Sequence, residues 1–305
     1  MKPLHLAAAS LALVLALPSS AQPAAPTPPA AHDWPSNWNT PTEPFRIIDN
    51  IYYVGTEGLG SYLFVTPEGH ILLDGALPES APLIEANIQK LGFKLSDIKY
   101  LLNSHAHFDH SGGLAQLKKD TGATLIASER DQSALEGGFY LGNEDEGATV
   151  PKVKVDRAIQ DGYQLKLGGR TLTAHLTPGH SRGCTSWGFE AKDGGKTHPG
   201  LVFCSATIAA NRLVERPQYE GIVGDYRSTF EKAARLKVDV FLAPHPEFFD
   251  LSGKRVKLAA GARPNPFIDP AGYQGLIARL KAAFEVGLKE QRDAAAAKAV
   301  KAKGK

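Results

Sequence analysis

Four side chains of the types that bind metal ions lie within six residues of this 305-residue sequence: His105, His107, Asp109 and His110. The apolar run KYLL before them predicts a short buried strand. Side chains two residues apart in an extended chain project to the same side, so His105 and His107 are placed to bind one cation together. Imidazole nitrogens with a single carboxylate form a ligand set that suits Zn²⁺. The cluster therefore predicts a zinc site at a strand end.

The residues that follow this cluster favour convergence of its side chains. We expect the chain to turn into a helix around Asp109 or His110, which lets these two residues face a neighbouring cation. Ser111, Gly112 and Gly113 are small and allow close approach of the backbone where ligands meet. A lone histidine is most often an inert loop residue. Four ligand-type residues in this spacing favour a metal site instead.

Two further histidines follow predicted strands much later in the chain. His180 comes after TAHLT, and Pro178 and Gly179 form the turn that presents it. His245 comes after VDVFLAP, between two prolines. Each alone is as well explained as an ordinary loop histidine, but with the first cluster each completes a set of three ligands. Six ligands shared by two cations leave coordination positions open to water, whose pKa zinc lowers to about 7.

The motifs LLDGA, NSHAHFDHSGG, TAHLTPGH and APHP resemble those of the metallo-β-lactamase superfamily, from about Pro44 to the final helix. The resemblance is strongest to the β-lactamase subclass whose first zinc takes three histidines and whose second takes Asp-His-His. It implies two zinc ions per chain, one held by His105, His107 and His180 and the other by Asp109, His110 and His245. It also implies that Asp109 orients a zinc-bound hydroxide that attacks the β-lactam carbonyl.

Asp74 in LLDG matches the buried carboxylate that supports the metal-binding loops in this family. Spacing alone leaves it open as a turn residue before Gly75. Many relatives, including glyoxalase II and lactone hydrolases, place a metal-bridging aspartate after the sixth strand, where this chain reads VFCSAT. The β-lactamase subclass has a serine there, which Ser205 matches. Ser205 and Thr207 are therefore candidates for binding the substrate carboxylate through their hydroxyls, with simple packing as the alternative.

The beginning of the chain has the features of an export signal. Residues 1–21 combine an early lysine, a short apolar run and small residues before Ala21, which predicts a cleaved signal peptide and a periplasmic protein. Residues 22–43 are rich in proline and alanine and predict an extended, solvated lead-in. An exported chain meets an oxidising compartment, which favours a disulfide between Cys184 and Cys204 over buried thiols or metal ligands. A disulfide pair also occurs in some members of the resembling subclass.

The pattern of strands and helices predicts the fold class. Two similar sets of short strands and helices between residues 44 and 292 favour an α/β, four-layer αβ/βα sandwich of two mixed sheets flanked by helices. Ser228 and Glu231 form a capping-box pattern that predicts a helix start. A Gly-rich segment at 137–151 is expected to be a loop near the site. Residues 293–305 are predicted to be a fraying, lysine-rich tail.

The charge balance of 34 basic and 32 acidic residues gives no reason to expect a nucleic acid or an anionic surface as partner. No protein partner or membrane attachment after signal cleavage is expected, and the substrate is a small molecule. The predicted function is zinc-dependent hydrolysis of the β-lactam amide, which inactivates antibiotics. The alternatives are a lactonase or a glyoxalase II-like thioesterase on the same fold, and a non-catalytic periplasmic zinc-binding protein. A zinc-storage protein would favour one His-rich tract, whereas these ligands are scattered between residues 105 and 245.

Overall fold

A computed structural model describes residues 35–147 and 149–303 of the chain. The predicted signal peptide lies outside the described residues. The first β-sheet has seven strands in chain order: β1 (Phe45–Ile48), β2 (Ile51–Tyr53), β3 (Tyr62–Thr66), β4 (Gly69–Leu73), β5 (Ile98–Leu102), β6 (Thr124–Ser128) and β7 (Arg157–Ile159). Strands β1 to β4 form the predicted antiparallel meander, and β4 to β7 are parallel.

The second sheet has five strands in the order β12-β11-β10-β9-β8. Their bounds are β8 (Gln164–Leu167), β9 (Arg170–Leu176), β10 (Thr185–Asp193), β11 (Lys196–Val202) and β12 (Val240–Leu242). Strands β8 to β11 pair antiparallel, and β12 pairs parallel to β11 after a helical crossover. Both sheets are therefore mixed, as the sequence predicts.

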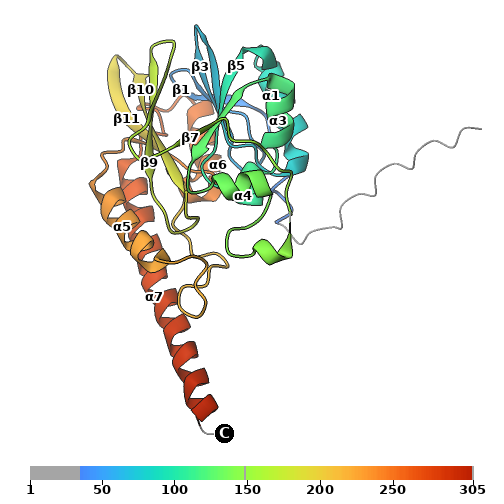
Figure 1. Cartoon of the computed structure of the whole chain (residues 1–305). Helices are drawn as coiled ribbons and strands as arrows, with labels where there is room; N and C mark the ends of the chain where they lie inside the picture. The colour runs from blue at the N-terminus through green and yellow to red at the C-terminus, as the bar shows by residue number, and fades with distance from the viewer. Residues whose placement is uncertain (1–34, 148, 304–305) are drawn as a thin grey trace, which may run out of the picture. The chain divides into compact units, whose positions relative to one another are not determined.

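Helices flank the two sheets (Figure 1). Helices α1 (Ala81–Lys90) and α3 (Leu114–Thr121) lie beside the first sheet, and α5 (Ile222–Arg235) and α7 (Pro270–Lys303) lie beside the second. The remaining α-helices are α2 (Phe108–Ser111), α4 (Gln132–Gly137) and α6 (Leu251–Ala259). Short 3-10 helices are η1 (Pro78–Ser80), η2 (Leu95–Asp97), η3 (Glu144–Glu146) and η4 (Pro246–Phe249). The predicted four-layer arrangement of helix, sheet, sheet and helix is confirmed.

Aromatic side chains fill the space between the sheets. Phe64 on β3 and Phe189 on β10 meet edge to face with ring centroids 5.5 Å apart. Trp187 on β10 is fully buried, and its indole N–H donates to the carbonyl of Asn103 at 3.2 Å. Burying a phenylalanine side chain stabilises a fold by roughly 1.5–3 kcal/mol relative to leaving it exposed. The hydrogen bond from Trp187 also joins the second sheet to the chain that leaves β5.

The strand directions bring several loops to one edge of each sheet. Strands β4, β5 and β6 run parallel, so their carboxyl ends share an edge of the first sheet. Strands β9 and β11 are both antiparallel to β10, and β12 is parallel to β11, so these three also end together. Ligands in α/β proteins bind outside the carboxyl ends of strands. All six predicted metal ligands follow such ends.

The predicted lead-in differs from the structure over residues 35–43. Trp38 packs with its ring centroid 5.5 Å from that of His245, and its carbonyl accepts a hydrogen bond from Thr56 at 2.6 Å. The backbone N–H groups of Glu57 and Gly58 also donate to carbonyls of this segment. The prediction of a solvated segment up to residue 43 is therefore wrong for residues 35–43, because Trp38 supplies apolar surface that packs on the domain.

The helical boundaries near the C-terminus also differ from prediction. Helix α5 begins at Ile222, so Ser228 lies inside it and donates to the carbonyl of Asp225 instead of capping its start. Helix α7 continues through the predicted tail to Lys303, because alanine and lysine are strong helix formers. Lys298 pairs with Glu215 at 2.7 Å along this extension. No helix among residues 35–147 and 149–303 combines the length and apolar character that a membrane crossing needs.

Two carboxyl groups meet where α1 packs beside α3. Burial, and then the hydrogen bond and negative charge of Asp120, raise the pKa of Glu85 from 4.5 to about 7. Between these two values the folded protein keeps a proton that the unfolded chain has lost, so the free energy of unfolding falls as the pH rises. The stabilisation is complete below about pH 4.5 and is lost as the pH rises through 7.

We therefore predict that Glu85→Gln, which stays neutral, flattens this loss. The melting temperature of the variant, relative to the natural protein, should be higher at pH 8 than at pH 5.5. Thermal unfolding followed by circular dichroism measures this difference at each pH. Glu79→Gln, an exposed glutamate just before α1, is the control. Identical pH profiles for Glu85→Gln and the natural protein would contradict the assignment.

Candidate metal centre

The carboxylate of Asp74 fixes the segment between β5 and α2 through hydrogen bonds. This residue follows β4 with a backbone φ of 65°, and its carboxylate accepts hydrogen bonds from the Ser104 N–H at 2.6 Å and the Asn103 side chain at 3.2 Å. Burial raises the pKa of Asp74 to about 6, although nearby His110 and these hydrogen bonds act in the opposite direction. The structure thus places Asp74 beneath the segment that carries His105, where the family resemblance expects a supporting carboxylate.

The first group of three imidazoles comes from two loops. His105 and His107 follow β5, and His180 follows β9. One ring nitrogen from each lies within 4.8 Å of the others, and the ring centroids are 4.5–4.8 Å apart. The three residues are 1%, 9% and 6% exposed. The structure therefore brings together the three histidines predicted for the first site, which we call the histidine cluster.

The second group adjoins the first. The Nε2 atoms of His110 and His245 are 3.1 Å apart and lie 3.2 Å and 3.4 Å from Oδ2 of Asp109. Three ligand atoms from α2 and from the loop after β12 therefore face one small space. The rings of His105 and His110 have centroids 4.4 Å apart, so the two groups are neighbours. We call Asp109, His110 and His245 the aspartate cluster.

Electrostatics distinguish the two clusters. Burial, together with neighbouring imidazoles, lowers the pKa of His105 and His107 well below the ordinary value, and burial lowers that of His180 to about 4. The histidine cluster is therefore neutral at pH 7, with lone pairs available for a cation. Burial alone would lower the pKa of His110, but the charge and hydrogen bond of Asp109, together with the charges of Asp74 and Glu247, outweigh burial and raise the pKa. The aspartate cluster carries a buried negative charge that a cation can neutralise.

Hydrogen bonds outside the clusters orient the rings. The Nδ1 atom of His180 donates to the carbonyl of Thr207 at 2.8 Å, which leaves Nε2 with its lone pair. The Nδ1 atom of His105 lies 3.0 Å from the Ser104 hydroxyl, while its buried Nε2 has no hydrogen-bond partner among the described residues. A buried polar atom without a partner costs about 1–3 kcal/mol. A divalent cation would satisfy that nitrogen, so the donor set fits zinc.

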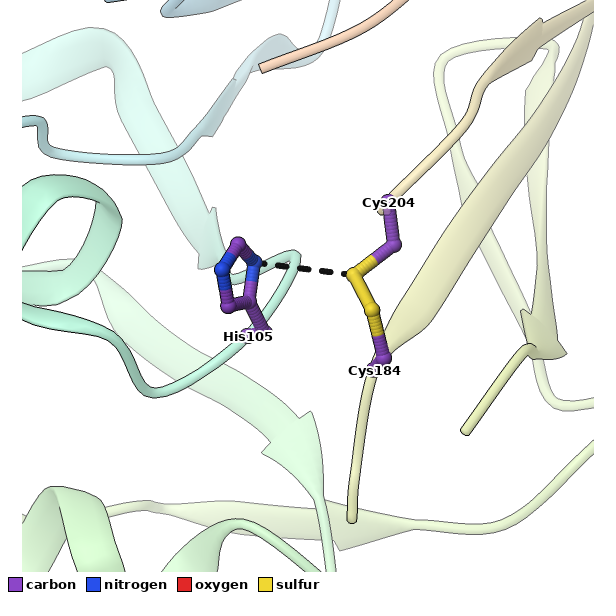
Figure 2. Close-up of side chains that lie close together, drawn as sticks. All are labelled: His105, Cys184 and Cys204. Carbon is purple, nitrogen blue, oxygen red and sulfur yellow. Dashed lines mark hydrogen bonds between the residues drawn. A yellow bond between two sulfur atoms is a disulfide. The ribbon is translucent and has the colours of Figure 1, made fainter. Parts of the chain in front are cut away.

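The two cysteines lie beside His105 (Figure 2). Cys184 and Cys204 form a disulfide with Cα atoms 5.9 Å apart, which confirms the preferred prediction. Sγ of Cys204 is 3.5 Å from Nδ1 of His105. Zinc binds cysteine as thiolate, and a disulfide sulfur carries no such charge. The alternative of cysteine metal ligands is therefore excluded for the oxidised protein.

The two hydroxyl residues after β11 differ in their surroundings. Ser205 is 1% exposed, and its hydroxyl accepts a hydrogen bond from the Thr207 N–H at 3.3 Å. Thr207 is half-buried, and its hydroxyl lies 3.0 Å from Nδ1 of His180. Thr207 is thus close to the histidine cluster, whereas Ser205 is covered. Substrate contact by either residue stays a prediction.

Two aromatic residues beside the clusters were not identified from the sequence. Tyr140 stacks on His107 with centroids 4.5 Å apart, and its hydroxyl donates to the side chain of Asn211 at 2.9 Å. This contact places Tyr140, which belongs to the predicted 137–151 loop, against the site. Trp38 packs beside His245. The aromatic residues of NWN and GGFYLGN can be seen in the sequence. Neither segment has the hydrophobic periodicity that would show where its side chains point.

Comparisons with known proteins agree with this geometry. A family model described as the metallo-beta-lactamase superfamily matches residues 56–194. The chain is similar to a subclass B3 metallo-β-lactamase of Bradyrhizobium japonicum, with 52% identity and a TM-score of 0.81 over 85% of this chain and 98% of that one. It is also similar to a class B3 di-zinc metallo-β-lactamase from an Alaskan soil metagenome, with 35% identity and a TM-score of 0.78 over 82% and 96% of the two chains.

Curated relatives match over a shorter range. A hydroxyacylglutathione hydrolase of Methylococcus capsulatus is 28% identical over 131 residues, which are 43% of this chain and 40% of that protein. The first curated relatives are matched over half of their length or less.

The separation of the clusters predicts the effect of removing one ligand. His245→Ala should lose the cation of the aspartate cluster and keep that of the histidine cluster, because it removes a ligand from only one of them. Elemental analysis after dialysis against a weak chelator measures the zinc content per chain. His198→Ala, which removes a histidine paired with Asp239 at 3.1 Å, should keep the full content. Loss of both ions from His245→Ala would contradict the division of ligands.

Proposed function

Because this chain belongs to the metallo-β-lactamase superfamily, we propose that it hydrolyses the amide bond of β-lactam antibiotics and binds two zinc ions to do so. The observation that carries this function is the pair of adjoining clusters, one of three histidines and one of Asp-His-His. Solved β-lactamases that share 35–52% identity with the chain are covered almost completely by it, which supports the same reaction.

The histidine cluster would hold one zinc ion and the aspartate cluster the other. Bound zinc supplies a Lewis acid for the carbonyl oxygen and lowers the pKa of water to about 7. The buried carboxylate of Asp109 faces both His110 and His245. Asp109 would accept a hydrogen bond from the attacking water and so orient it toward the lactam carbonyl. No serine nucleophile is needed.

The walls of the site supply groups that would position the substrate. A small cavity beside the histidine cluster, with room for about one water, is lined by His107, His180, Tyr140 and Arg182, among others. Arg182 is exposed at the rim of this cavity and offers a positive charge toward an anionic substrate. The half-buried hydroxyl of Thr207 is the better placed of the two predicted carboxylate-binding hydroxyls. Trp38 gives an apolar surface beside the aspartate cluster.

Lactone or thioester hydrolysis on the same fold is the competing function. The curated hydroxyacylglutathione hydrolase matches part of the chain and gives that function its support. The chain has Ser205, and no carboxylate, where those relatives carry the metal-bridging aspartate. The segment VFCSAT contains no other carboxylate that could take the place of that aspartate, and Ser205 itself is buried. This difference favours the β-lactam amide.

We propose the periplasm as the compartment in which the protein acts. The features of residues 1–21 support export. The disulfide between Cys184 and Cys204 supports an oxidising environment, because cytosolic proteins rarely keep such bonds.

The function is tested by turnover measurements on the purified mature chain. We expect hydrolysis of a carbapenem or a cephalosporin in zinc-containing buffer, loss of activity with a chelator, and recovery when zinc is restored. Absorbance of the β-lactam ring follows the reaction directly. An N-acyl homoserine lactone and a glutathione thioester are assayed in parallel. Brisk turnover of either, with no turnover of both β-lactams, would overturn the proposal in favour of the competing function.

A further inference from the structure

A second buried carboxylate lies beside the loops of the histidine cluster, and the reaction proposed above does not use it. Asp131 follows β6 and directly precedes α4, and it is 2% exposed. Its Oδ2 accepts hydrogen bonds from the Ala106 N–H at 3.0 Å and the Ser181 hydroxyl at 2.8 Å. Its Oδ1 accepts from the Gly183 N–H at 2.7 Å. All three donors belong to the loops that carry metal ligands.

Two of these three donors are sequence neighbours of metal ligands. Ala106 lies between His105 and His107, and Ser181 directly follows His180. One carboxylate therefore holds a residue that is adjacent in the chain to each ligand of the histidine cluster, through the Ala106 N–H and the Ser181 hydroxyl. It also joins two loops that follow strands of different sheets, since His105 follows β5 and His180 follows β9.

Asp131 is itself fixed by regular structure. Its N–H donates to the carbonyl of Ser128 at the end of β6, and its carbonyl accepts from the Leu135 N–H in α4. Side chains that position a site are most effective when rigid elements hold them. The close approach of the loop also needs Gly183, because a Cβ there would lie 2.5 Å from Cγ of Asp131.

Burying the carboxylate of Asp131 costs free energy. Burial raises the pKa of Asp131, although the hydrogen bonds from Ser181, Ala106 and Gly183 act to lower it. An apolar side chain of similar size often serves packing equally well or better than a buried charge. An acceptor-only group that takes three donors at once has a use that packing does not explain.

We propose that Asp131 is a positioning residue for the histidine metal site: by tying the loop after β5 to the loop after β9, it sets the separation of the three imidazoles and so the zinc affinity of that site. This inference rests on the proposed function only in taking zinc as the ion of the histidine cluster. Partners outside the ligand shell typically contribute 10–100-fold to metal affinity.

Asp131→Asn is the decisive variant, because its amide replaces an acceptor with a donor that faces Gly183, Ala106 or Ser181. It is made in the His245→Ala background, so that zinc binding reports on the histidine cluster. We expect its zinc affinity, measured by competition with a chromophoric chelator, to fall by about tenfold or more. The absorption spectrum of bound Co²⁺ should change as well, because the imidazoles move. Ser181→Ala removes one of the three hydrogen bonds and should give a smaller loss.

Asp156→Asn in the same background is the matched control. Asp156 also accepts a backbone hydrogen bond, from the Leu125 N–H at 2.9 Å, and pairs with Lys118 at 2.7 Å, and within the described part of the chain neither of these partners lies in a metal-binding loop. It should lower the melting temperature of the metal-free protein without changing zinc affinity or the Co²⁺ spectrum. Unchanged zinc affinity and an unchanged spectrum in Asp131→Asn would overturn the inference.

If Asp131→Asn does not fold, as judged by circular dichroism, Ser181→Ala decides the question. Full zinc affinity in Ser181→Ala would then overturn the inference, and a several-fold loss would support it. These measurements read metal binding and not turnover. A protein that binds zinc with Asp131-dependent affinity but leaves β-lactams intact would overturn the proposed function alone.

Discussion

The candidate centre depends on the hydrogen bonds that join the two sheets at the carboxyl ends of their strands. The Thr185 N–H on β10 donates to the carbonyl of Ser104 at 2.7 Å, and the Trp187 indole donates to the carbonyl of Asn103. These bonds hold the segment after β5 against the second sheet. These bonds, together with those of Asp131, keep the two edges close enough for ligands from the first sheet to meet His180 and His245. The metal centre is thus a property of the sheet packing as much as of the HAHFDH motif.

Burial affects the pKa values of the two clusters differently. In the histidine cluster, burial lowers the pKa values and keeps the imidazoles neutral, so their lone pairs are available. In the aspartate cluster, Asp109 keeps its charge because His110 and His245 offset the burial that would raise its pKa. A cation that binds to either cluster replaces protons or contacts ring nitrogens that lack a hydrogen-bond partner. Metal binding therefore compensates for the free-energy cost of burying these groups.

The ligands could be predicted from the sequence because metal binding demands particular residue types, and six of them follow predicted strands. The mixed sheets were predictable for a similar reason, since hairpins and crossovers differ in length. Asp131 could not be found in this way, because an aspartate before a short helix looks like an ordinary cap. Trp38 and Tyr140 lie in segments without apolar periodicity, and their contacts with His245 and His107 join parts of the chain far apart in sequence. Helix α7 extends beyond its predicted end because the alanine- and lysine-rich sequence continues to favour a helix after its contacts with the core end.

The disulfide has a chemical consequence beyond linking β10 to the end of β11. Thiolates are soft ligands that bind zinc strongly, and Sγ of Cys204 lies 3.5 Å from Nδ1 of His105. As free thiolates, Cys184 and Cys204 would form with His105 a second ligand set, whose ligand atoms lie within 4.8 Å of one another, and would compete for the His105 ring. The covalent bond between Cys184 and Cys204 removes both competitors and leaves a neutral, buried surface behind the imidazole. A site built from histidines can therefore lie directly beside two cysteines, provided that the protein is oxidised.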